Sequence, residues 1–281
     1  MKKSISNNFL FVNLACGSSY IEAPEWVNLD YSTSSPAVQR ANIFGTALPF
    51  EDGTVDVVYC SHFVEHIPRV RIPGFLTECY RILKPGGGVA RFVLPDFQEI
   101  CREYLQQRES GNHAKADFVV MEMLDQCVRV KSGGELGALY KSLKEQPDAN
   151  IAEYIFERCG ANISNGYGNT APENSWLRLF KHPVNILFYL EKKYCRFISL
   201  LFPSAFREQN VSFAQVGEKH AWLYDERQLS SLLKKAGFAK VVRMSFDTTS
   251  ITNFPLQPLD VSEDGNPRKG KESMYLEAFK T

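Results

Sequence analysis

The sequence has no run of about 20 apolar residues, the length that a membrane-spanning helix needs. Near its start, Lys2 and Lys3 precede an apolar run at Phe9–Val12, but Asn13 interrupts that run. A secretion signal requires an apolar core of about 7–15 residues, which this run does not reach. We therefore expect no export signal and no membrane span, and a cytoplasmic location.

The chain also lacks an excess of charge of either sign, because 32 Lys and Arg residues balance 32 Asp and Glu residues. Proteins that attract nucleic acid or anionic membranes through their overall field are usually strongly basic. We expect no nucleic-acid partner, and any charged partner would need a local patch.

Seven cysteines are present, but no two of them form a Cys-x-x-Cys pair. An odd and scattered set argues against a disulfide framework or a zinc site and favours a reducing compartment. We expect these cysteines to be small buried apolar residues. They are Cys16, Cys60, Cys79, Cys101, Cys127, Cys159 and Cys195.

Glycine is scarce in the one stretch that resembles a nucleotide-binding loop, FVNLACGSSYIEAPEWVNLDYS at residues 11–32. A dinucleotide fingerprint carries three glycines and places its acidic residue about 20 residues further on. Here Gly17 stands alone, and Asp30 follows after only 13 residues. The loop therefore argues against a pyrophosphate ligand and favours an adenosine-type ligand without a diphosphate.

What the chain does contain is an alternation of short apolar runs with helical patterns over its first hundred residues. A helix over residues 71–83 precedes the last of five expected strands, and Asp96 with Glu99 forms a capping box for another helix after it. Such alternation predicts a Rossmann-like, doubly wound α/β sheet that is mostly parallel. The expected strands are Phe9–Ala15, Trp26–Asp30, Gln39–Ile43, Val55–Cys60 and Val89–Leu94.

The C-terminal part returns to this pattern. Asp225 caps an expected helix that Gly237 ends, and strands are expected at Val241–Phe246 and Met274–Phe279. The last strand pairs antiparallel, plausibly in a hairpin, which makes a seven-stranded sheet. We assign residues 1–104 and 223–281 to a core, and residues 105–222 to a mainly helical insertion that forms an acceptor-binding lid.

Unusual residues stand where four of the expected strands end. Open α/β sheets bind ligands at the carboxyl ends of their strands, where the strand order reverses. Gly17 permits close backbone approach, and the Asp30 carboxylate suits a pair of ribose hydroxyls. Asn42-Ile43 and Cys60-Ser61-His62 follow the third and fourth strands.

The segments NLACGS, VNLD, ANIFGTALPFEDGTVDVVYCSHFVEHI and LTECYRILKPGGGVARFVLPD together resemble the class I S-adenosylmethionine-dependent methyltransferases, in particular their small-molecule subgroup. The resemblance is strong over residues 8–100 and looser over 218–281, and it leaves the insertion out. It implies S-adenosyl-L-methionine as cofactor. The resemblance implies that Ala15, Cys16 and Gly17 lie beside the amino-acid moiety, Asp30 at the ribose, and Asn42 and Ile43 at the adenine. Cys60, Ser61 and His62 are expected to face cofactor and acceptor, and Ser18 and Tyr31 complete the expected cofactor-binding set.

Two departures from the family pattern affect this expectation. The glycine loop is reduced to Gly17, and Asn42 stands where many members have an acid. An amide oxygen still accepts a hydrogen bond from the adenine amino group. We therefore expect cofactor binding to survive, with a weaker affinity.

Three residues are candidates for catalysis: His62, His220 and Tyr224. His62 and His66 lie one turn apart, but no third ligand is evident, so we expect no metal site. His66 is expected to hydrogen-bond within the scaffold, and Glu65 either orients the cofactor or is solvated. Tyr224 and His220 either close over the acceptor or pack the hinge.

Residues 176–206 combine basic side chains with an apolar stripe at helical spacing. A basic amphipathic helix can lie on a membrane surface, although such a stripe more often packs on its own domain, which is our expectation here. The stripe comprises Ile186, Leu190, Tyr194, Phe197, Ile198 and Leu201.

The sequence as a whole predicts S-adenosylmethionine-dependent methyl transfer to a small or medium organic acceptor. Resemblance to family members that modify sugars and secondary metabolites favours O-methylation. The alternatives are a lipid-acceptor methyltransferase at a membrane surface, a non-catalytic S-adenosylmethionine-binding scaffold, and, least favoured, a dinucleotide oxidoreductase.

Overall fold

A computed structural model describes residues 9–31, 35–44, 47–161, 163 and 183–281. Its centre is a seven-stranded sheet of order β3-β2-β1-β4-β5-β7-β6, in which β7 alone runs antiparallel to its neighbours. This confirms the Rossmann-like sheet and its antiparallel C-terminal strand. The strands are β1 (Phe11–Leu14), β2 (Trp26–Asp30), β3 (Val38–Arg40), β4 (Val57–Ser61), β5 (Val89–Pro95), β6 (Lys240–Met244) and β7 (Ser273–Phe279).

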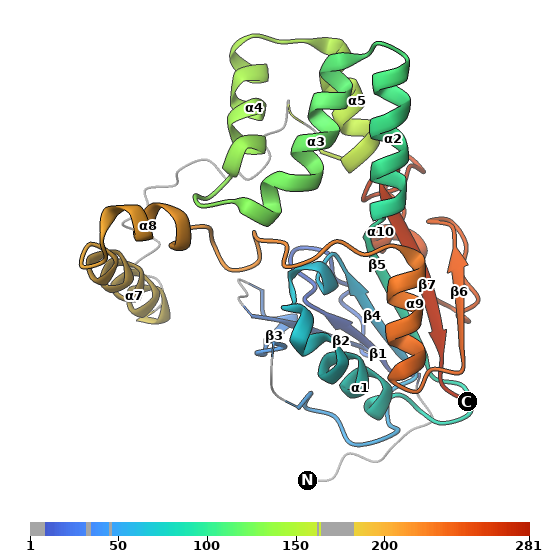
Figure 1. The fold of residues 1–281 in the computed structure, drawn as a ribbon. Coiled ribbons are helices and arrows are strands. Elements are labelled where there is room, and N and C mark those ends of the chain that lie inside the picture. The colour runs from blue at the N-terminus through green and yellow to red at the C-terminus, as the bar shows by residue number, and fades with distance from the viewer. Residues whose placement is uncertain (1–8, 32–34, 45–46, 162, 164–182) are drawn as a thin grey trace.

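Apolar side chains cover both faces of the sheet, as expected for central parallel strands. Helices α1 (Ile72–Ile82) and α9 (Glu226–Lys235) lie side by side on one face (Figure 1). On the other face, an aromatic cluster that includes Trp26, Tyr59 and Phe254 packs with the short helix α10 (Leu256–Leu259). Burial of this surface is the main source of the sheet's stability.

Two helices of the core begin with the side-chain caps that the sequence predicts. Asp96 accepts hydrogen bonds from the backbone amides of Gln98 and Glu99 at the start of α2 (Phe97–Glu109). Asp225 accepts one from Gln228 at the start of α9. Each cap satisfies amides that have no partner within the helix.

Two expected elements differ in the structure. The third strand ends at Arg40 because the Asn42 side chain accepts a hydrogen bond from the Phe44 amide, which turns the chain out of the sheet. Strands β6 and β7 pair antiparallel as expected, but residues 245–272 separate them. The connection is therefore long and is not a tight hairpin.

The insertion begins as a unit of packed helices beyond the carboxyl ends of the strands (Figure 1). Helix α2 packs along α3 (His113–Val128), and α4 (Gly134–Glu145) and α5 (Ala149–Cys159) complete what we call the helical unit, α2–α5. It has its own apolar core, with Ile100, Phe118 and Ile155 at the centre. Helix α2 continues across the expected boundary at residues 104/105, so one rigid helix joins the unit to the sheet.

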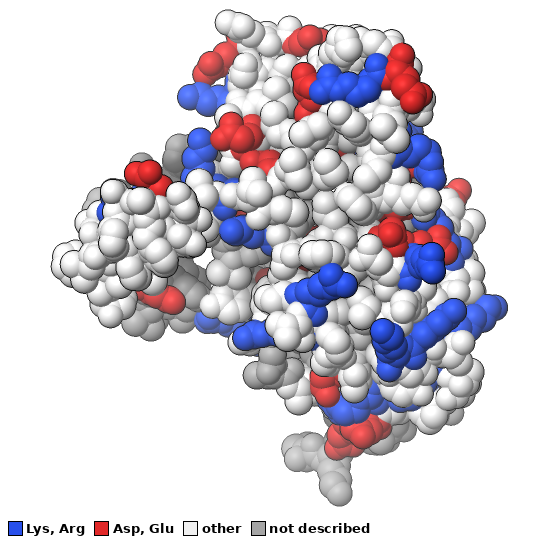
Figure 2. All heavy atoms as spheres, viewed as in Figure 1, with Lys and Arg blue, Asp and Glu red and all other residues white. Residues whose placement is uncertain are grey.

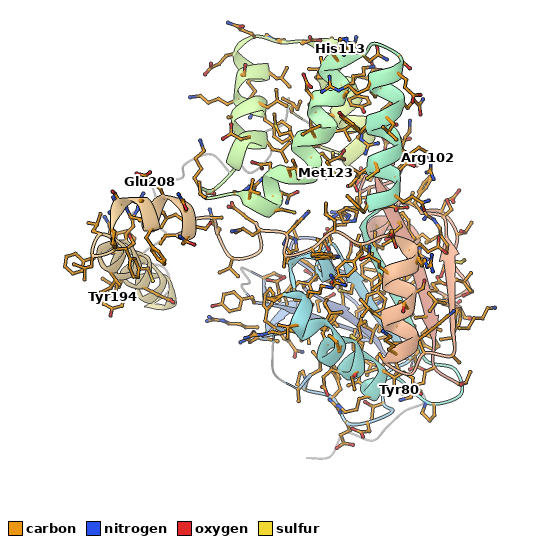
Figure 3. All side chains as sticks on the ribbon, viewed as in Figure 1. Tyr80, Arg102, His113, Met123, Tyr194 and Glu208 are labelled. Carbon is orange, nitrogen blue, oxygen red and sulfur yellow. The ribbon has the colours of Figure 1, made fainter. Side chains whose placement is uncertain are left out.

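Helices α7 (Pro183–Ser199) and α8 (Ser204–Asn210) form an arm that stands apart from the sheet, and the face that it presents in Figure 2 is mostly uncharged (Figures 1 and 2). Tyr194 projects from it in Figure 3, and its side chain is 65% exposed. Leu190, Phe197 and Leu201 are exposed as well. The expectation that this stripe packs on its own domain is thus wrong for these four side chains, whereas Ile198, of the same stripe, is half-buried. Residues 164–182, and the Ile186 side chain, lie outside the described residues.

Within the described residues, every helix is too short or too polar to cross a bilayer. All seven cysteines are unpaired. Cys16, Cys60 and Cys79 are buried as expected, whereas Cys195, on the arm, is exposed. The exposed position follows from the way the arm stands off the core.

Candidate active site

The strand order reverses between β1 and β4, which are neighbours at the centre of the sheet. A cavity of about 630 Å³ opens at the carboxyl ends of these two strands. That position is the switch point at which open α/β sheets hold ligands. We call this space the cofactor cavity. Its walls include Ala15, Asp30, Tyr31, Ile43, Phe44, His62 and Phe63, together with several residues of the segment 212–217.

The loop after β1 is fixed against the end of β2. The Gly17 amide donates a hydrogen bond to a carboxylate oxygen of Asp30 over 2.9 Å. Ala15 and Gly17 both have left-handed backbone conformations, with φ of 53° and 54°. A left-handed alanine is uncommon outside strained functional loops. Between them, burial raises the pKa of Cys16 to about 12, and the nearby Asp30 carboxylate contributes to the rise.

Apolar rings line the opposite side of the cofactor cavity. Ile43 is buried, and the Phe44 and Phe63 rings meet edge to face with centroids 5.0 Å apart. The sequence prediction included Ile43 but missed both phenylalanines. Phe44 directly follows Asn42-Ile43, so its place in the chain was a usable signal.

Other expected cofactor residues stand back from the cavity walls. Ser18 and Asn42 are exposed, and the Asn42 oxygen is engaged by the Phe44 amide at 3.1 Å. Cys60 is fully buried in the core. Ser61 is the last residue of β4 and directly precedes His62, which lines the cavity. Their direct contact with a cofactor remains a prediction.

His62 is held in an unusual conformation by the loop after β4. Its φ is 50°, its Nε2 lies 3.0 Å from the Ser273 hydroxyl, and its Nδ1 lies 3.4 Å from a Glu65 oxygen. Burial lowers the pKa of His62 well below its usual range, and Lys269, His220 and His66 lower it further. The ring is therefore neutral at pH 7 and has one nitrogen lone pair with which to accept a proton.

A second and larger cavity, of about 970 Å³, lies between the strand ends and the helical unit. We call it the large cavity. His62 and His66 line both cavities, and so do Gln215 and Gly217. Other walls of the large cavity come from Pro95 and Glu272 of the sheet region, Phe118, Glu122 and Tyr140 of the helical unit, and His220.

The three expected catalytic residues differ in their positions. His62 and His220 line the large cavity, but Tyr224 packs in the core of the sheet and belongs to the walls of neither cavity. Burial raises the pKa of Tyr224, which keeps the phenol protonated. Its backbone oxygen accepts from the Phe97 amide over 2.9 Å, which ties the chain after the insertion to the start of α2.

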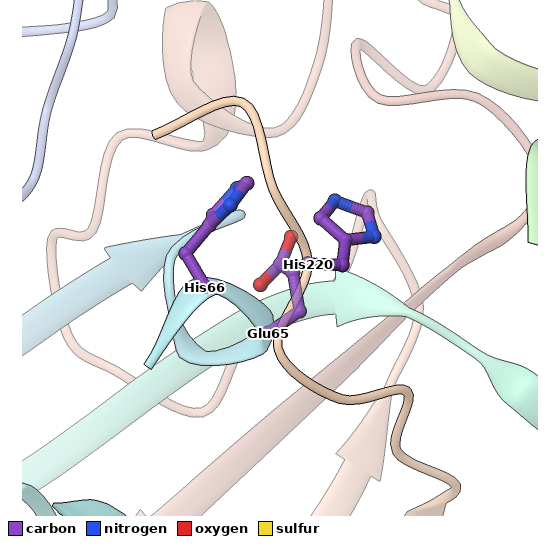
Figure 4. Close-up of side chains that lie close together, drawn as sticks. All are labelled: Glu65, His66 and His220. Atoms are coloured by element: carbon purple, nitrogen blue, oxygen red, sulfur yellow. The ribbon is translucent and has the colours of Figure 1, made fainter. Parts of the chain in front are cut away.

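The short helical turn η1 (Val64–His66) is tied to the segment 219–222, which returns from the insertion. The Glu65 carbonyl accepts hydrogen bonds from the amides of Ala221 and Trp222, at 2.6 and 3.2 Å. His66 Nδ1 lies 2.9 Å from the Lys219 carbonyl oxygen, which confirms its expected scaffold contact. These bonds bring the side chains of Glu65, His66 and His220 together (Figure 4).

Glu65 is only 1% exposed, so the sequence reading of a solvated carboxylate is wrong. Burial raises its pKa, against the lowering effect of His66. Burial also lowers the pKa of His220 to about 3, and His66 and Arg129 add to that effect. Sequence reasoning could not connect Glu65 with His220, because the insertion separates them in the chain.

The cofactor cavity has the groups that a nucleoside ligand requires. A carboxylate at the end of β2 can accept hydrogen bonds from two adjacent ribose hydroxyls, and the wall of Ile43, Phe44 and Phe63 can hold a purine ring. Ligand pockets of about 300–1,000 Å³ are typical of such sites. S-adenosylmethionine therefore fits the residues present.

One protein family model matches this part of the chain. Residues 24–90 match the family model of a methyltransferase domain, which covers β2 to the start of β5 and the loops that carry Asp30, Ile43 and His62. No curated protein matches the chain.

Three solved structures that are similar to the chain bear names of S-adenosylmethionine-dependent methyltransferases, and their identity to it is low. One from Archaeoglobus fulgidus is 11% identical over 97% of this chain and 86% of its own, with a TM-score of 0.40. A possible histamine N-methyltransferase from Thermotoga maritima is 13% identical over 99% and 84%, with a TM-score of 0.36. One from Mesorhizobium loti is 20% identical over 32% of this chain and about half, 48%, of its own, with a TM-score of 0.26.

The family match includes the loops after β2, β3 and β4, which carry cavity-lining residues, and this part of the chain is similar to a methyltransferase domain.

Proposed function

We propose that this protein transfers a methyl group from S-adenosylmethionine to a hydroxyl group of a small or medium organic acceptor, such as a sugar or a secondary metabolite. The observation that carries the proposal is that His62 lines both cavities. A donor in one cavity and an acceptor in the other would meet beside this ring.

The cofactor supplies an activated methyl group and leaves as a neutral thioether. The chain's own task is to hold the donor and the acceptor in line. Asp30 would accept hydrogen bonds from the ribose hydroxyls, and Ile43 with Phe44 and Phe63 would contact the adenine. The loop after β1, in which Ala15 and Gly17 have a left-handed backbone, would lie beside the amino-acid end of the cofactor.

A hydroxyl acceptor must lose its proton as it is methylated, and we assign that proton to His62. Its lowered pKa keeps the ring in the accepting form at physiological pH. Ser273, whose hydroxyl lies 3.0 Å from Nε2, holds the ring in place. His220 lines the same cavity from the insertion side and would contact the acceptor.

The helical unit would bind the acceptor and exclude water, which gives the insertion 105–222 the role of a lid. The large cavity has walls from both the sheet and this unit, so an acceptor within it touches both. Holding two reactants in a dry, fixed geometry is the main source of rate enhancement in such a transfer.

The test has two stages, both with the full chain. Calorimetry with S-adenosylhomocysteine measures cofactor binding, and transfer from radiolabelled S-adenosylmethionine to a panel of sugars and phenolic metabolites measures activity. His62→Asn should lower kcat by roughly 10²-fold or more with little change in S-adenosylhomocysteine affinity, whereas the distant control His113→Asn, at the outer end of the helical unit in Figure 3, should change neither.

Each result has a separate meaning. Absence of S-adenosylhomocysteine binding by the wild type would overturn the cofactor assignment. Binding without transfer to any acceptor of the panel would favour a non-catalytic scaffold. An unchanged kcat in His62→Asn would remove His62 as the base.

A lipid acceptor at a membrane surface is the second candidate, favoured by the exposed apolar side chains of the arm, among them Leu190, Phe197 and Leu201. An exposed patch of this kind is typical of an interaction surface. The protein should then sediment with vesicles of phosphatidylcholine and phosphatidylglycerol, and the Leu190→Ser/Phe197→Ser variant should sediment less. Absence of wild-type sedimentation would exclude this candidate.

A further inference from the structure

We propose that Glu65, His66 and His220 form a binding site for a divalent transition-metal ion of the Zn²⁺ type. The sequence indicated no such site, because a third ligand near His62 and His66 was missing. The fold supplies it from the far side of the insertion, where His220 packs beside the η1 turn (Figure 4).

The ligand atoms are close enough to share one ion. One potential ligand atom from each of the three residues lies within 4.8 Å of the other two. Bonds of about 2.0–2.1 Å would place neighbouring ligand atoms of a tetrahedral zinc site about 3.4 Å apart. Small rotations of the three side chains would bring the ligand atoms from their present separation to that of a zinc site. The His66 and His220 rings meet edge to face with centroids 4.8 Å apart.

The scaffold presets the ligand orientation of His66. A carbonyl oxygen only accepts, so the contact with Lys219 at 2.9 Å requires Nδ1 of His66 to donate. Its Nε2 then carries the lone pair and is the atom that faces an ion. A histidine that donates its other nitrogen to a backbone carbonyl is the usual arrangement at metal sites.

The main chain fixes the other two ligands. Two amides of the segment 219–222 donate to the Glu65 carbonyl, and the His220 amide donates to the Gln126 carbonyl of α3 over 3.0 Å. The segment is thus held between the η1 turn and the helical unit. The site would join the core to the insertion.

Buried polar atoms without partners provide the second, independent observation. Among the described residues, both carboxylate oxygens of Glu65 and Nδ1 of His220 are buried and make no hydrogen bond. The nearest ring atom, His62 Nδ1, is 3.4 Å from Glu65 Oε1 without making one. Buried polar groups are almost always satisfied, and several unsatisfied atoms at one point indicate a missing ligand. A cation between them satisfies the carboxylate and a ring nitrogen at once.

The donor set favours one class of ion. Two imidazoles and one carboxylate suit zinc and its first-row neighbours, whereas Mg²⁺ and Ca²⁺ prefer oxygen ligands. Arg129, one cation near the site, is paired with Asp125 at 2.5 Å, and Lys269 is a second cation that acts on Glu65. The carboxylate of Glu65 supplies the negative charge of the donor set.

Three protein ligands leave at least one coordination position open. His66 and His220 line the large cavity, so that position faces the space assigned to the acceptor. An acceptor hydroxyl coordinated there would have a lowered pKa and would be oriented toward His62. This role rests on the proposed function, whereas ion binding itself does not.

Zinc binding to the full chain tests the site directly. Protein stripped with a chelator and dialysed is titrated calorimetrically with Zn²⁺, and the bound ion is counted by elemental analysis. We expect one ion per chain. Glu65→Gln, His66→Ala and His220→Ala should each weaken binding by more than about 10- to 100-fold, the loss that changes around a metal ligand already cause, and His113→Ala should leave it unchanged. Circular dichroism identifies any variant that fails to fold, and Glu65→Gln, which preserves side-chain shape, is the decisive variant.

S-adenosylhomocysteine titration in the same samples separates this proposal from the proposed function. Zinc binding that each of the three variants weakens supports the site whether or not S-adenosylhomocysteine binds. No zinc binding by the wild type, or equal binding by the folded Glu65→Gln variant, would overturn the site and leave the methyl-transfer proposal intact. A cobalt-substituted protein should show no thiolate-to-metal absorption band, and such a band would assign the ion to cysteine instead.

Discussion

The backbone amide of Gly17 donates a hydrogen bond to the carboxylate of Asp30, over 2.9 Å, and joins the loop after β1 to the end of β2. This contact accounts for the single glycine in the loop. The loop has to approach one carboxylate and the cofactor, and it does not have to surround a pyrophosphate. One left-handed glycine, with φ of 54°, is enough for that turn.

Asp30→Ala should weaken S-adenosylhomocysteine binding by at least about tenfold, because the substitution removes both the oxygens that we propose to bind the ribose and the partner of the Gly17 amide. A lost hydrogen bond to a charged group changes binding by about 1.5–3 kcal/mol, which corresponds to this range. Calorimetry measures the change. Asp247→Ala, at an exposed position after β6, is the control and should bind as the wild type does. Equal affinity in the two variants would contradict the role of Asp30.

Local signals were sufficient to predict the sheet and the first half of the site. The apolar run at Val89–Leu94 and the cap at Asp96 act within a few residues of chain, and the strand and the helix start where those signals stand. The position of Asp30 followed for the same reason, because a parallel strand exposes its carboxyl end at a known edge.

The rest of the site could not be predicted because it depends on contacts between distant residues. His220 meets Glu65 and His66 only after the chain has passed through the helical unit and the arm. Ser273 reaches His62 from a strand near the C-terminus. The burial of Glu65 likewise depends on packing by residues 219–222. The sequence pattern around Glu65 gives no sign of that packing.

Arg91→Met should reduce the free energy of unfolding by about 3–5 kcal/mol. Arg91 is completely buried and contacts the carboxylates of Asp260 and Glu277, each at 2.7 Å, so its loss would leave two buried acids without their cation. Urea denaturation followed by circular dichroism measures this. The control Arg102→Met, at a surface pair with Glu99, should change stability by less than about 1 kcal/mol. A similar, small effect of both substitutions would show that the buried cluster contributes little.

Gly270→Ala should destabilise the protein more than Gly265→Ala does. Both glycines have left-handed conformations, with φ of 77° and 80°, so both substitutions carry the same backbone strain of about 1–2 kcal/mol. At Gly270, however, an added Cβ would lie 1.9 Å from the Arg158 carbonyl oxygen, whereas at Gly265 it meets no described atom within 4 Å. We expect a further loss of about 1–3 kcal/mol at Gly270, measured by urea denaturation. Equal losses of stability in the two variants would show that the backbone at the contact between α5 and the segment before β7 can shift without a cost in stability.

Cys16 should react much more slowly with iodoacetamide than Cys195 at pH 8. The thiolate is the reactive form, and burial together with Asp30 raises the pKa of Cys16 to about 12, so that only about one thiol in ten thousand is ionised at pH 8. Cys195 is exposed on the arm. Because the deprotonated fraction of Cys16 rises about tenfold for each pH unit below its pKa, its labelling should accelerate steeply between pH 8 and pH 10. Mass spectrometry of peptides after timed labelling gives both rates.

The Asp30→Asn variant separates the electrostatic cause from simple burial. Removing the negative charge beside Cys16 should lower its pKa and speed its labelling at pH 8, because the thiolate no longer faces a carboxylate. Cys79, which lies on α1 and is fully buried in the core, should stay unlabelled in both proteins. If Cys79 and Cys16 gained reactivity together, the variant would have opened the fold, and the change at Cys16 would not report on Asp30. Labelling of wild-type Cys16 as fast as Cys195 would contradict the geometry of the loop after β1.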